Sequence, residues 1–184
     1  MTTSRDQGSK TVLYLLVFCR IVLGLVLLLA FANKVLNMPR FQQTVAGFGI
    51  LPPRLSAIAA VLFVAGELVV VLLMALGGAF LGPGFALATL LLVSFSVALL
   101  SVLVRGMNVS CGCFGPSQKA VSAYDLWRNA GFILCALAGL GALTAQRAGG
   151  DLSLAELAIV AATAAVFVTI WLNLRDIVQL LRLS

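Results

Sequence analysis

The stretch from Thr11 to Ala32, TVLYLLVFCRIVLGLVLLLAFA, decides the fold class of this chain. It is apolar apart from a single charged residue, Arg20. An α-helix of about 20 residues spans the roughly 30 Å of hydrocarbon in a bilayer, so this stretch is long enough to cross a membrane. It is longer than the apolar core of a signal peptide, and no small-residue cleavage site comes before Lys34. We therefore expect a retained membrane span.

The composition extends this prediction to the whole chain. Of its 184 residues, 62% are hydrophobic and only 10% are charged, and the mean hydropathy is +1.14. Soluble domains of this size are far more polar. Five spans of about 20 residues would use most of the length. The sequence thus predicts an all-α, polytopic membrane bundle that forms one domain over residues 1–184.

The apolar segments and the breaks between them give the expected order of elements. A polar tail, 1–10, precedes the first span, and a connector at 33–53 contains a short interfacial helix marked by apolar residues three or four positions apart. A glycine-rich turn over 77–84 ends the second span, and a tail at 175–184 lies along the interface. The expected spans are 11–32, 55–76, the segment from that turn to 104, 124–143 and 154–174, with Ser122 as N-cap and Asp125 in the first turn of the fourth.

The loop at 105–123 carries two thiols one residue apart, Cys111-Gly112-Cys113. Gly112 allows a sharp turn that points both sulfurs the same way, and Gly115-Pro116 stops a helix from running through. Two thiols this close can form a strained disulfide, which exchanges readily. Because the chain has no histidine, this pair is the candidate centre of any chemistry.

Two other interpretations of the pair remain open at this stage. A free cysteine is often a small buried hydrophobic residue and nothing more. Soft thiolates also bind Cu(I). A closed zinc site is disfavoured, because the chain has neither a histidine nor a second closely spaced cysteine pair. Cys19 and Cys135, which fall within predicted spans, are expected to be packing residues.

Two charged residues fall within the first two spans. Arg20 lies about 12 residues before the end of the first span and Glu67 about 12 residues after the start of the second. In adjacent antiparallel helices both are roughly 18 Å below the same membrane face, and we expect them to pair. An unpaired charge at such depth costs on the order of 3 kcal/mol or more. The pair either fixes the register of two helices or belongs to a polar cavity that binds a small molecule or passes protons. Lys34, Arg40, Arg128 and Asn129 would ring its mouth, although snorkelling to headgroups explains them equally well.

The orientation in the membrane is predicted differently by two arguments. Eight basic residues fall on the expected side of the Cys loop and three on the other: Lys34, Arg40, Arg54, Arg105, Lys119, Arg128, Arg175 and Arg182 against Arg5, Lys10 and Arg147. This asymmetry favours a cytoplasmic loop. A labile disulfide persists more easily outside the reducing cytoplasm, which favours the opposite side. The net charge of +6 suits anionic lipid better than nucleic acid.

Several of these residues occur in an order that resembles the MauE family of membrane proteins, which is related to DoxX-like proteins. The resemblance covers about residues 15 to 140, and its most specific part is the run Cys111 to Gly115 followed by Arg128-Asn129. The other matching positions are Arg20, Gly24, Lys34, Phe41, Leu51-Pro52, Glu67 and Arg105-Gly106. It implies a four-helix core plus one further helix, in a bacterial plasma membrane. It also implies thiol redox chemistry with a thioredoxin-like partner in methylamine utilisation, and a quinone link through the DoxX relatives.

The leading hypothesis from the sequence is a membrane thiol–disulfide relay. Cys111 and Cys113 would exchange electrons with a thioredoxin-like protein, and a pocket formed by Arg20, Glu67, Lys34, Arg128 and Asn129 would hold a quinone or another small acceptor. Two alternatives come from other classes: a non-catalytic scaffold for a redox or transport complex, and a Cu(I) carrier.

Overall fold

The structure is a computed structural model, and it describes residues 3–49, 52–106, 122–146 and 152–174. All regular structure in these ranges is helical: α1 (Thr3–Leu36), α2 (Met38–Gly47), α3 (Pro53–Leu76), the 3-10 turn η1 (Gly78–Phe80), α4 (Leu81–Val104), α5 (Ala123–Ala145) and α6 (Leu154–Leu172). Five of these helices are long and apolar enough to cross a membrane. The predicted fold class and the five spans are thus confirmed.

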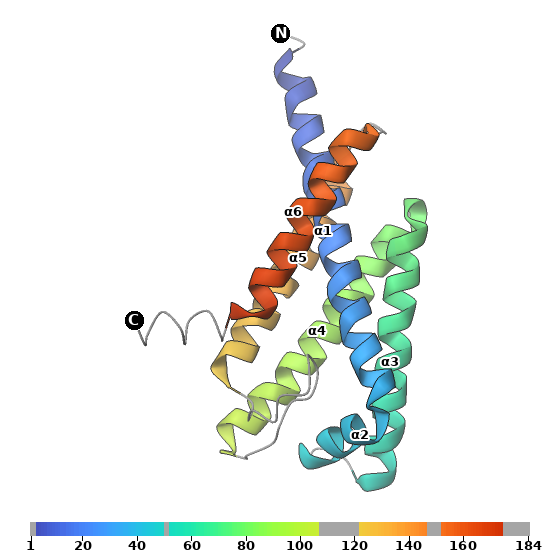
Figure 1. Cartoon of the computed structure of the whole chain (residues 1–184), viewed down its shortest axis with the longest axis vertical. Helices are drawn as coiled ribbons and strands as arrows, with labels where there is room; N and C mark the ends of the chain where they lie inside the picture. The colour runs from blue at the N-terminus through green and yellow to red at the C-terminus, as the bar shows by residue number, and fades with distance from the viewer. Residues whose placement is uncertain (1–2, 50–51, 107–121, 147–151, 175–184) are drawn as a thin grey trace.

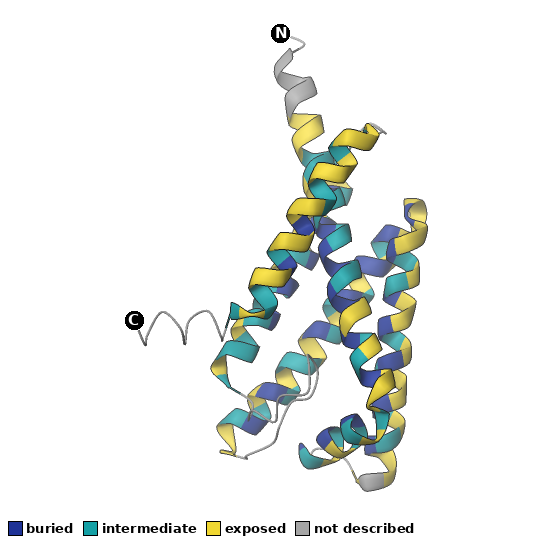
Figure 2. Cartoon of the chain, viewed as in Figure 1, coloured by how far each residue is buried: buried dark blue, intermediate teal, exposed yellow. Residues whose placement is uncertain are grey.

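Helix α1 is the centre of the bundle (Figure 1). It packs against α3, α5 and α6, while α4 packs against α3 on one side and α5 on the other. The short helix α2 lies across the lower end of α3 in that view. As Figure 2 shows, the buried residues lie where these helices face one another, and the outward faces are exposed. Exposed leucine and valine side chains on those faces suit contact with lipid.

The central position of α1 follows from a stripe of residues repeated every three or four positions. These residues face one side of a helix and are all buried: Leu16, Cys19, Leu23, Val26, Ala30 and Lys34. A similar stripe on α3 consists of Ala60, Val64, Glu67, Val70 and Met74. Each stripe therefore carries one charged residue into the core.

The described structure corrects two predicted boundaries. Helix α1 continues to Leu36, past the predicted end at 32, because Lys34 faces the core and continues the buried stripe. Helix α4 already begins at Leu81, inside the predicted glycine turn. Pro83 is tolerated there because the first N–H groups of a helix have no intrahelical partner. The turn itself is confined to Gly77 and the following η1.

The connector helix and the start of α5 agree with the predictions. Phe41 and Phe48 are buried in or directly after α2, as the apolar spacing indicates. At the start of α5, the backbone N–H and the hydroxyl of Ser122 both donate to Asp125 Oδ2, at 3.0 and 3.1 Å. The predicted N-cap residue therefore pairs with the predicted first-turn acid.

Helix α6 is attached mainly to α1. The rings of Phe18 and Phe167 meet edge to face with centroids 5.6 Å apart, and Tyr14 Oη donates to Glu156 at 2.5 Å. At the other end of α6, Trp171 Nε1 donates to the carbonyl of Arg128 on α5 at 3.1 Å. These contacts hold α6 along the outside of the four-helix core.

Candidate functional site

The buried charges of the bundle meet close to the C-terminal end of α1. Lys34 Nζ donates to Glu67 Oε1 of α3 and forms an ion pair with it. Each of the two side chains is only 3% exposed. Side chains on a helix lean toward its N-terminus, so Lys34 extends back into the bundle toward Glu67. The pair joins the two helices at a depth where neither charge reaches water.

Three phenylalanine rings surround the ammonium group of Lys34. The ring centroids of Phe41, Phe63 and Phe95 lie 5.1, 4.8 and 5.6 Å from Nζ, and Phe63 is in contact with both of the other rings. A cation over an aromatic face gains about 0.5–1 kcal/mol at the surface and more when it is desolvated. We call these three rings the aromatic cage. It brings α2, α3 and α4 together around a side chain of α1.

Asn129 adds an amide from α5 to the same region. Its Nδ2 donates to Leu92 O at 2.9 Å and to Ser96 Oγ at 2.7 Å, both on α4. Lys34, Glu67 and Asn129 line one small cavity of about 20 Å³, together with Phe63 and Phe95. This volume accommodates about one water molecule and is far too small for a quinone ring.

One oxygen of this region lacks a partner among the described residues. Glu67 Oε2 is buried and accepts no hydrogen bond, while Oε1 holds Lys34. A buried acceptor without a donor costs about 1–3 kcal/mol. Such a group commonly interacts with an ordered water or moves a proton. The small cavity that Glu67 lines is the place where one water could satisfy it.

The predicted pairing of Arg20 with Glu67 is wrong. Arg20 Nε donates to Met74 O at 2.6 Å and Nη2 donates to Ala75 O at 2.9 Å. These are carbonyls of the last turn of α3, which lack intrahelical partners and carry the negative end of the helix dipole. Arg20 therefore caps the C-terminus of α3 at the end of the bundle opposite to α2, and Lys34 takes its place beside Glu67.

The surroundings of Arg20 explain how it fits there. An apolar groove of about 390 Å³ runs between α1 and α3 beside it, lined by Gly24, Leu28, Val71 and Leu157 among others. Gly77 adopts a φ of +72°, and a Cβ at this position would lie 2.9 Å from Arg20 Nη2. The guanidinium thus lies directly on the backbone of the turn after α3. Glu67 is not part of this groove, and Arg20 does not line the small cavity beside Glu67.

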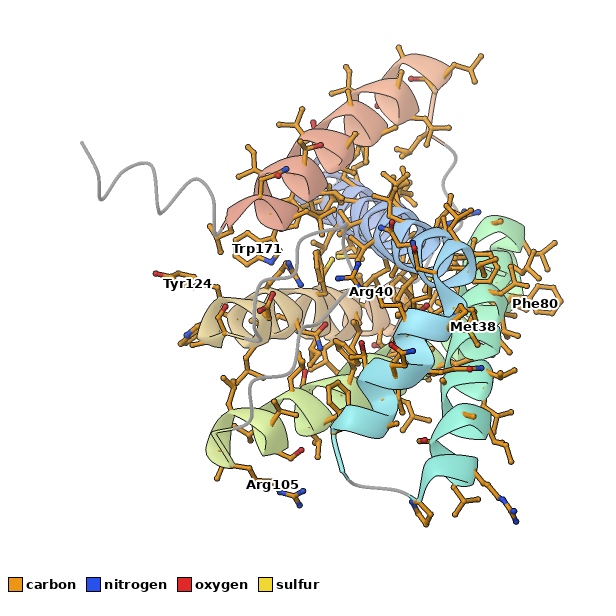
Figure 3. The ribbon with its side chains drawn as sticks, turned by 60° about the horizontal axis from the view of Figure 1, so that its bottom comes forward. Met38, Arg40, Phe80, Arg105, Tyr124 and Trp171 are labelled. Atoms are coloured by element: carbon orange, nitrogen blue, oxygen red, sulfur yellow. The ribbon has the colours of Figure 1, made fainter. Side chains whose placement is uncertain are left out.

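The other predicted mouth residues lie at the end of the bundle near α2. Arg128 Nη2 forms an ion pair with Asp125 at 3.2 Å within the first turns of α5. Figure 3 looks onto this end and shows Arg40, Arg105, Tyr124 and Trp171 around it. Of the predicted site residues, the structure brings together Lys34, Glu67 and Asn129. Arg128 is next to Asn129 in the chain but pairs with Asp125 instead.

The two thiols of the predicted centre, Cys111 and Cys113, lie outside the described residues. The helix ends that flank their segment are described: α4 ends at Val104 and α5 begins at Ala123. Both ends lie at the same end of the bundle as α2 (Figure 1). Next to them, a Cβ on Gly49 would come within 4.0 Å of Arg105 Nη1, so the end of α4 also lies close to the end of α2.

The aromatic cage and the Lys34–Glu67 pair were not predicted from the sequence. The Lys34–Glu67 pair could have been predicted from the stripes of buried residues on α1 and α3. Lys34 follows Leu23 and Ala30 at helical spacing, and Glu67 follows Ala60 and Val64, whereas Arg20 stands one position away from the buried Cys19. The sequence gives no comparable indication that Phe41, Phe63 and Phe95, from three helices, meet around one ammonium group.

The fold and the site define a class of protein: a five-span helical membrane protein with a caged lysine–glutamate pair in its core. A family model described as "Methylamine utilisation protein MauE" matches residues 12–143. The chain belongs to the MauE family. No curated protein and no solved structure matches it. The matched range begins within α1, includes α2, α3 and α4 completely, and ends two residues before the end of α5, so α6 lies outside it.

Proposed function

We propose that this protein is a membrane thiol–disulfide relay that serves an exported, disulfide-containing enzyme. Membership of the MauE family implies a membrane accessory role in methylamine utilisation. Two thiols one residue apart, Cys111 and Cys113, are the observation that carries the finer proposal. Such a pair cycles between dithiol and disulfide by exchange with a second dithiol protein, and two electrons and two protons pass between them.

The site around Lys34 and Glu67 supports this proposal because it holds the helices in fixed positions. It is not the place where the redox reaction occurs. The Lys34–Glu67 pair and the aromatic cage tie α1, α2, α3 and α4 together, and Asn129 ties α5 to α4. The segment with the two thiols joins α4 to α5. A fixed position of these two helix ends would present the thiols to a thioredoxin-like partner in one orientation. A quinone acceptor, if one takes part, binds elsewhere than in the cavity beside Glu67.

Trapping of a mixed disulfide tests the relay. In Cys113→Ser, Cys111 can still form a mixed disulfide with a thioredoxin-like partner, but the Cys113 thiol that would attack it and release the partner is missing. A covalent complex should therefore accumulate in membranes and disappear on reduction. Thiol exchange by the variant should be lost. Ser117→Ala, in the same segment, is the matched control and should behave like the wild type. Undiminished exchange in Cys113→Ser would overturn the relay.

A scaffold without redox chemistry is the second candidate. It is favoured by the buried site, whose charged groups bind one another around a cavity of only about 20 Å³. A scaffold should still co-purify with its partner when Cys111 and Cys113 are both replaced by serine. Loss of the partner from that double variant would argue against the scaffold.

A further inference from the structure

Arg20 brings a positive charge to the end of α3 that the described residues balance only in part. Its Nε and Nη2 donate to the carbonyls of Met74 and Ala75 at 2.6 and 2.9 Å. A guanidinium has five N–H groups, so both N–H groups of Nη1 and one of Nη2 have no acceptor among the described residues. The C-terminal end of a helix supplies roughly half a negative charge, which leaves part of the positive charge unbalanced.

The described acids do not supply the remaining negative charge. No carboxylate of the described residues forms an ion pair with Arg20. Glu156 of α6 is next to Leu157, which lines the groove beside Arg20, but both of its oxygens are engaged. Oε1 accepts from Tyr14, and Oε2 accepts from the N–H and the hydroxyl of Ser153. An anion from the membrane can therefore pair with Arg20 without competition from Glu156.

The guanidinium lies close to the level of the lipid headgroups. It bonds to the last turn of α3, and the turn that follows, η1 (Gly78–Phe80), is exposed at all three residues. Exposed backbone outside the spanning helices does not remain in the hydrocarbon of a bilayer, so this turn marks the headgroup region. Helices α1 and α6 continue past this end of α3 (Figure 1). The free N–H groups of Arg20 are thus within reach of lipid phosphates.

The groove of about 390 Å³ beside Arg20 has the shape and polarity for an acyl chain. Apart from Arg20, all of its lining residues are apolar, and it continues along α1 as far as Leu28, about 12 Å further toward the middle of the membrane. Gly24 leaves room along this path, because a Cβ there would only reach ordinary contact with Met74 Cβ, at 3.9 Å. Leu28 is 45% exposed, so the groove is open to lipid.

We propose that this groove binds one anionic phospholipid, with its phosphate on the free N–H groups of Arg20 and one acyl chain along the groove. A guanidinium binds phosphate oxygens through paired N–H donors. The net negative charge of the lipid balances the charge that the end of α3 leaves over, which a zwitterionic lipid does not do. Because Leu157 lines the groove, the bound chain contacts α6 as well as α1 and α3. The proposal is independent of Cys111 and Cys113.

Native mass spectrometry of the purified full-length protein tests the site. The protein receives equal amounts of phosphatidylglycerol and phosphatidylcholine in detergent, and the lipids that stay bound are counted. We expect one phosphatidylglycerol per chain, and a higher unfolding temperature with phosphatidylglycerol than with phosphatidylcholine. Equal retention of the two lipids would overturn the proposal. Inorganic phosphate at the same concentration should leave the unfolding temperature unchanged, and stabilisation equal to that by phosphatidylglycerol would overturn the lipid as the ligand.

Two variants assign the bound lipid to this groove. Arg20→Gln removes the charge, and Gly24→Leu fills the groove while Arg20 stays in place. Each should weaken the affinity for phosphatidylglycerol by about tenfold or more, as expected for the loss of charge-assisted hydrogen bonds or of the acyl-chain contacts. Titration of the unfolding temperature with the lipid measures this affinity.

Matched control variants carry the same substitutions outside the groove. Arg54→Gln changes an exposed arginine at the other end of α3, and Gly141→Leu adds a leucine to α5 where a Cβ would meet nothing within 4 Å. Both should bind the lipid like the wild type. Folded Gly24→Leu with wild-type affinity would overturn the proposal even if Arg20→Gln fails to fold, and so would equal losses in the variants and their controls.

Discussion

Lys34 is the residue on which the site depends. A single ammonium group is in contact with a carboxylate of α3 and with rings from α2, α3 and α4. An isolated charge in such a place is expensive, and the pair is tolerated because each partner neutralises the other. An intact buried ion pair therefore adds little to the stability of the fold. Loss of only one partner, however, should destabilise the fold strongly.

Replacement of one partner should therefore cost more than replacement of both. Glu67→Gln leaves the Lys34 ammonium buried without a counter-charge, and we expect destabilisation by about 3–5 kcal/mol, as for other broken buried pairs. The double variant Lys34→Met, Glu67→Gln restores neutrality and should recover most of this loss. Thermal unfolding of the purified protein in detergent measures both. A double variant no more stable than Glu67→Gln would contradict the role of the pair.

The cage makes a second prediction at the residue scale. Lys34→Ala removes the ammonium but leaves three rings and the Glu67 carboxylate around the space that it filled. A small alkylammonium ion has the charge and the apolar surface to take that place. We expect methylammonium to raise the unfolding temperature of Lys34→Ala and to leave the wild type unchanged. Sodium chloride at equal ionic strength is the control, and an equal effect of both salts would contradict the prediction.

At the scale of the element, α5 packs very closely against α4 at Gly139. Gly139 is packed so closely against α4 that a Cβ there would lie 2.3 Å from Phe85 Cε1, whereas a Cβ on Gly141 would meet nothing within 4 Å. Phe85 is fully buried. Close packing of helices through a glycine is typical of membrane proteins.

A matched pair of alanine variants should separate packing from helix propensity. Gly139→Ala forces α4 and α5 apart, and we expect a loss of about 1–3 kcal/mol, the usual cost of overpacking. Gly141→Ala adds a methyl group in open space and replaces a poor helix former by a good one, so its stability should be equal or slightly higher. Unfolding in detergent compares the two. Equal losses in both variants would rule out a tight seam at Gly139.

The elements were predictable from the sequence because long apolar runs and their breaks are local features. The five spans, α2 and the start of α5 at Ser122 needed no knowledge of tertiary contacts. The pairing of charges was not predictable by depth alone. Depth placed Arg20 opposite Glu67, but α1 continues to Leu36. Arg20 lies beside the end of α3, and Lys34, about four helical turns further along α1, is the residue level with Glu67.

At the scale of the whole molecule, the described contacts weaken the charge argument for orientation. Lys34 counts among the basic residues on the Cys-loop side, yet it is buried beside Glu67 and adds no charge to that surface. Arg20 caps α3 near the opposite end of the bundle. The positive-inside rule applies to charges in loops and near span ends, so the asymmetry is smaller than the sequence suggests.

The proposed relay requires one particular orientation of the chain in the membrane. The proposed disulfide between Cys111 and Cys113 would persist only outside a reducing cytoplasm, so we expect the end of the bundle near α2 to face the outer side of the membrane. Because the described chain crosses the membrane five times, the C-terminal end of α6 falls on that side too and the N-terminal end of α1 on the other. A C-terminal alkaline phosphatase fusion should be active in bacterial cells, and a C-terminal green fluorescent protein fusion should be dark. The reverse result would place both thiols in the cytosol, contradict the relay, and leave the scaffold or a Cu(I) carrier as the function of this end of the molecule.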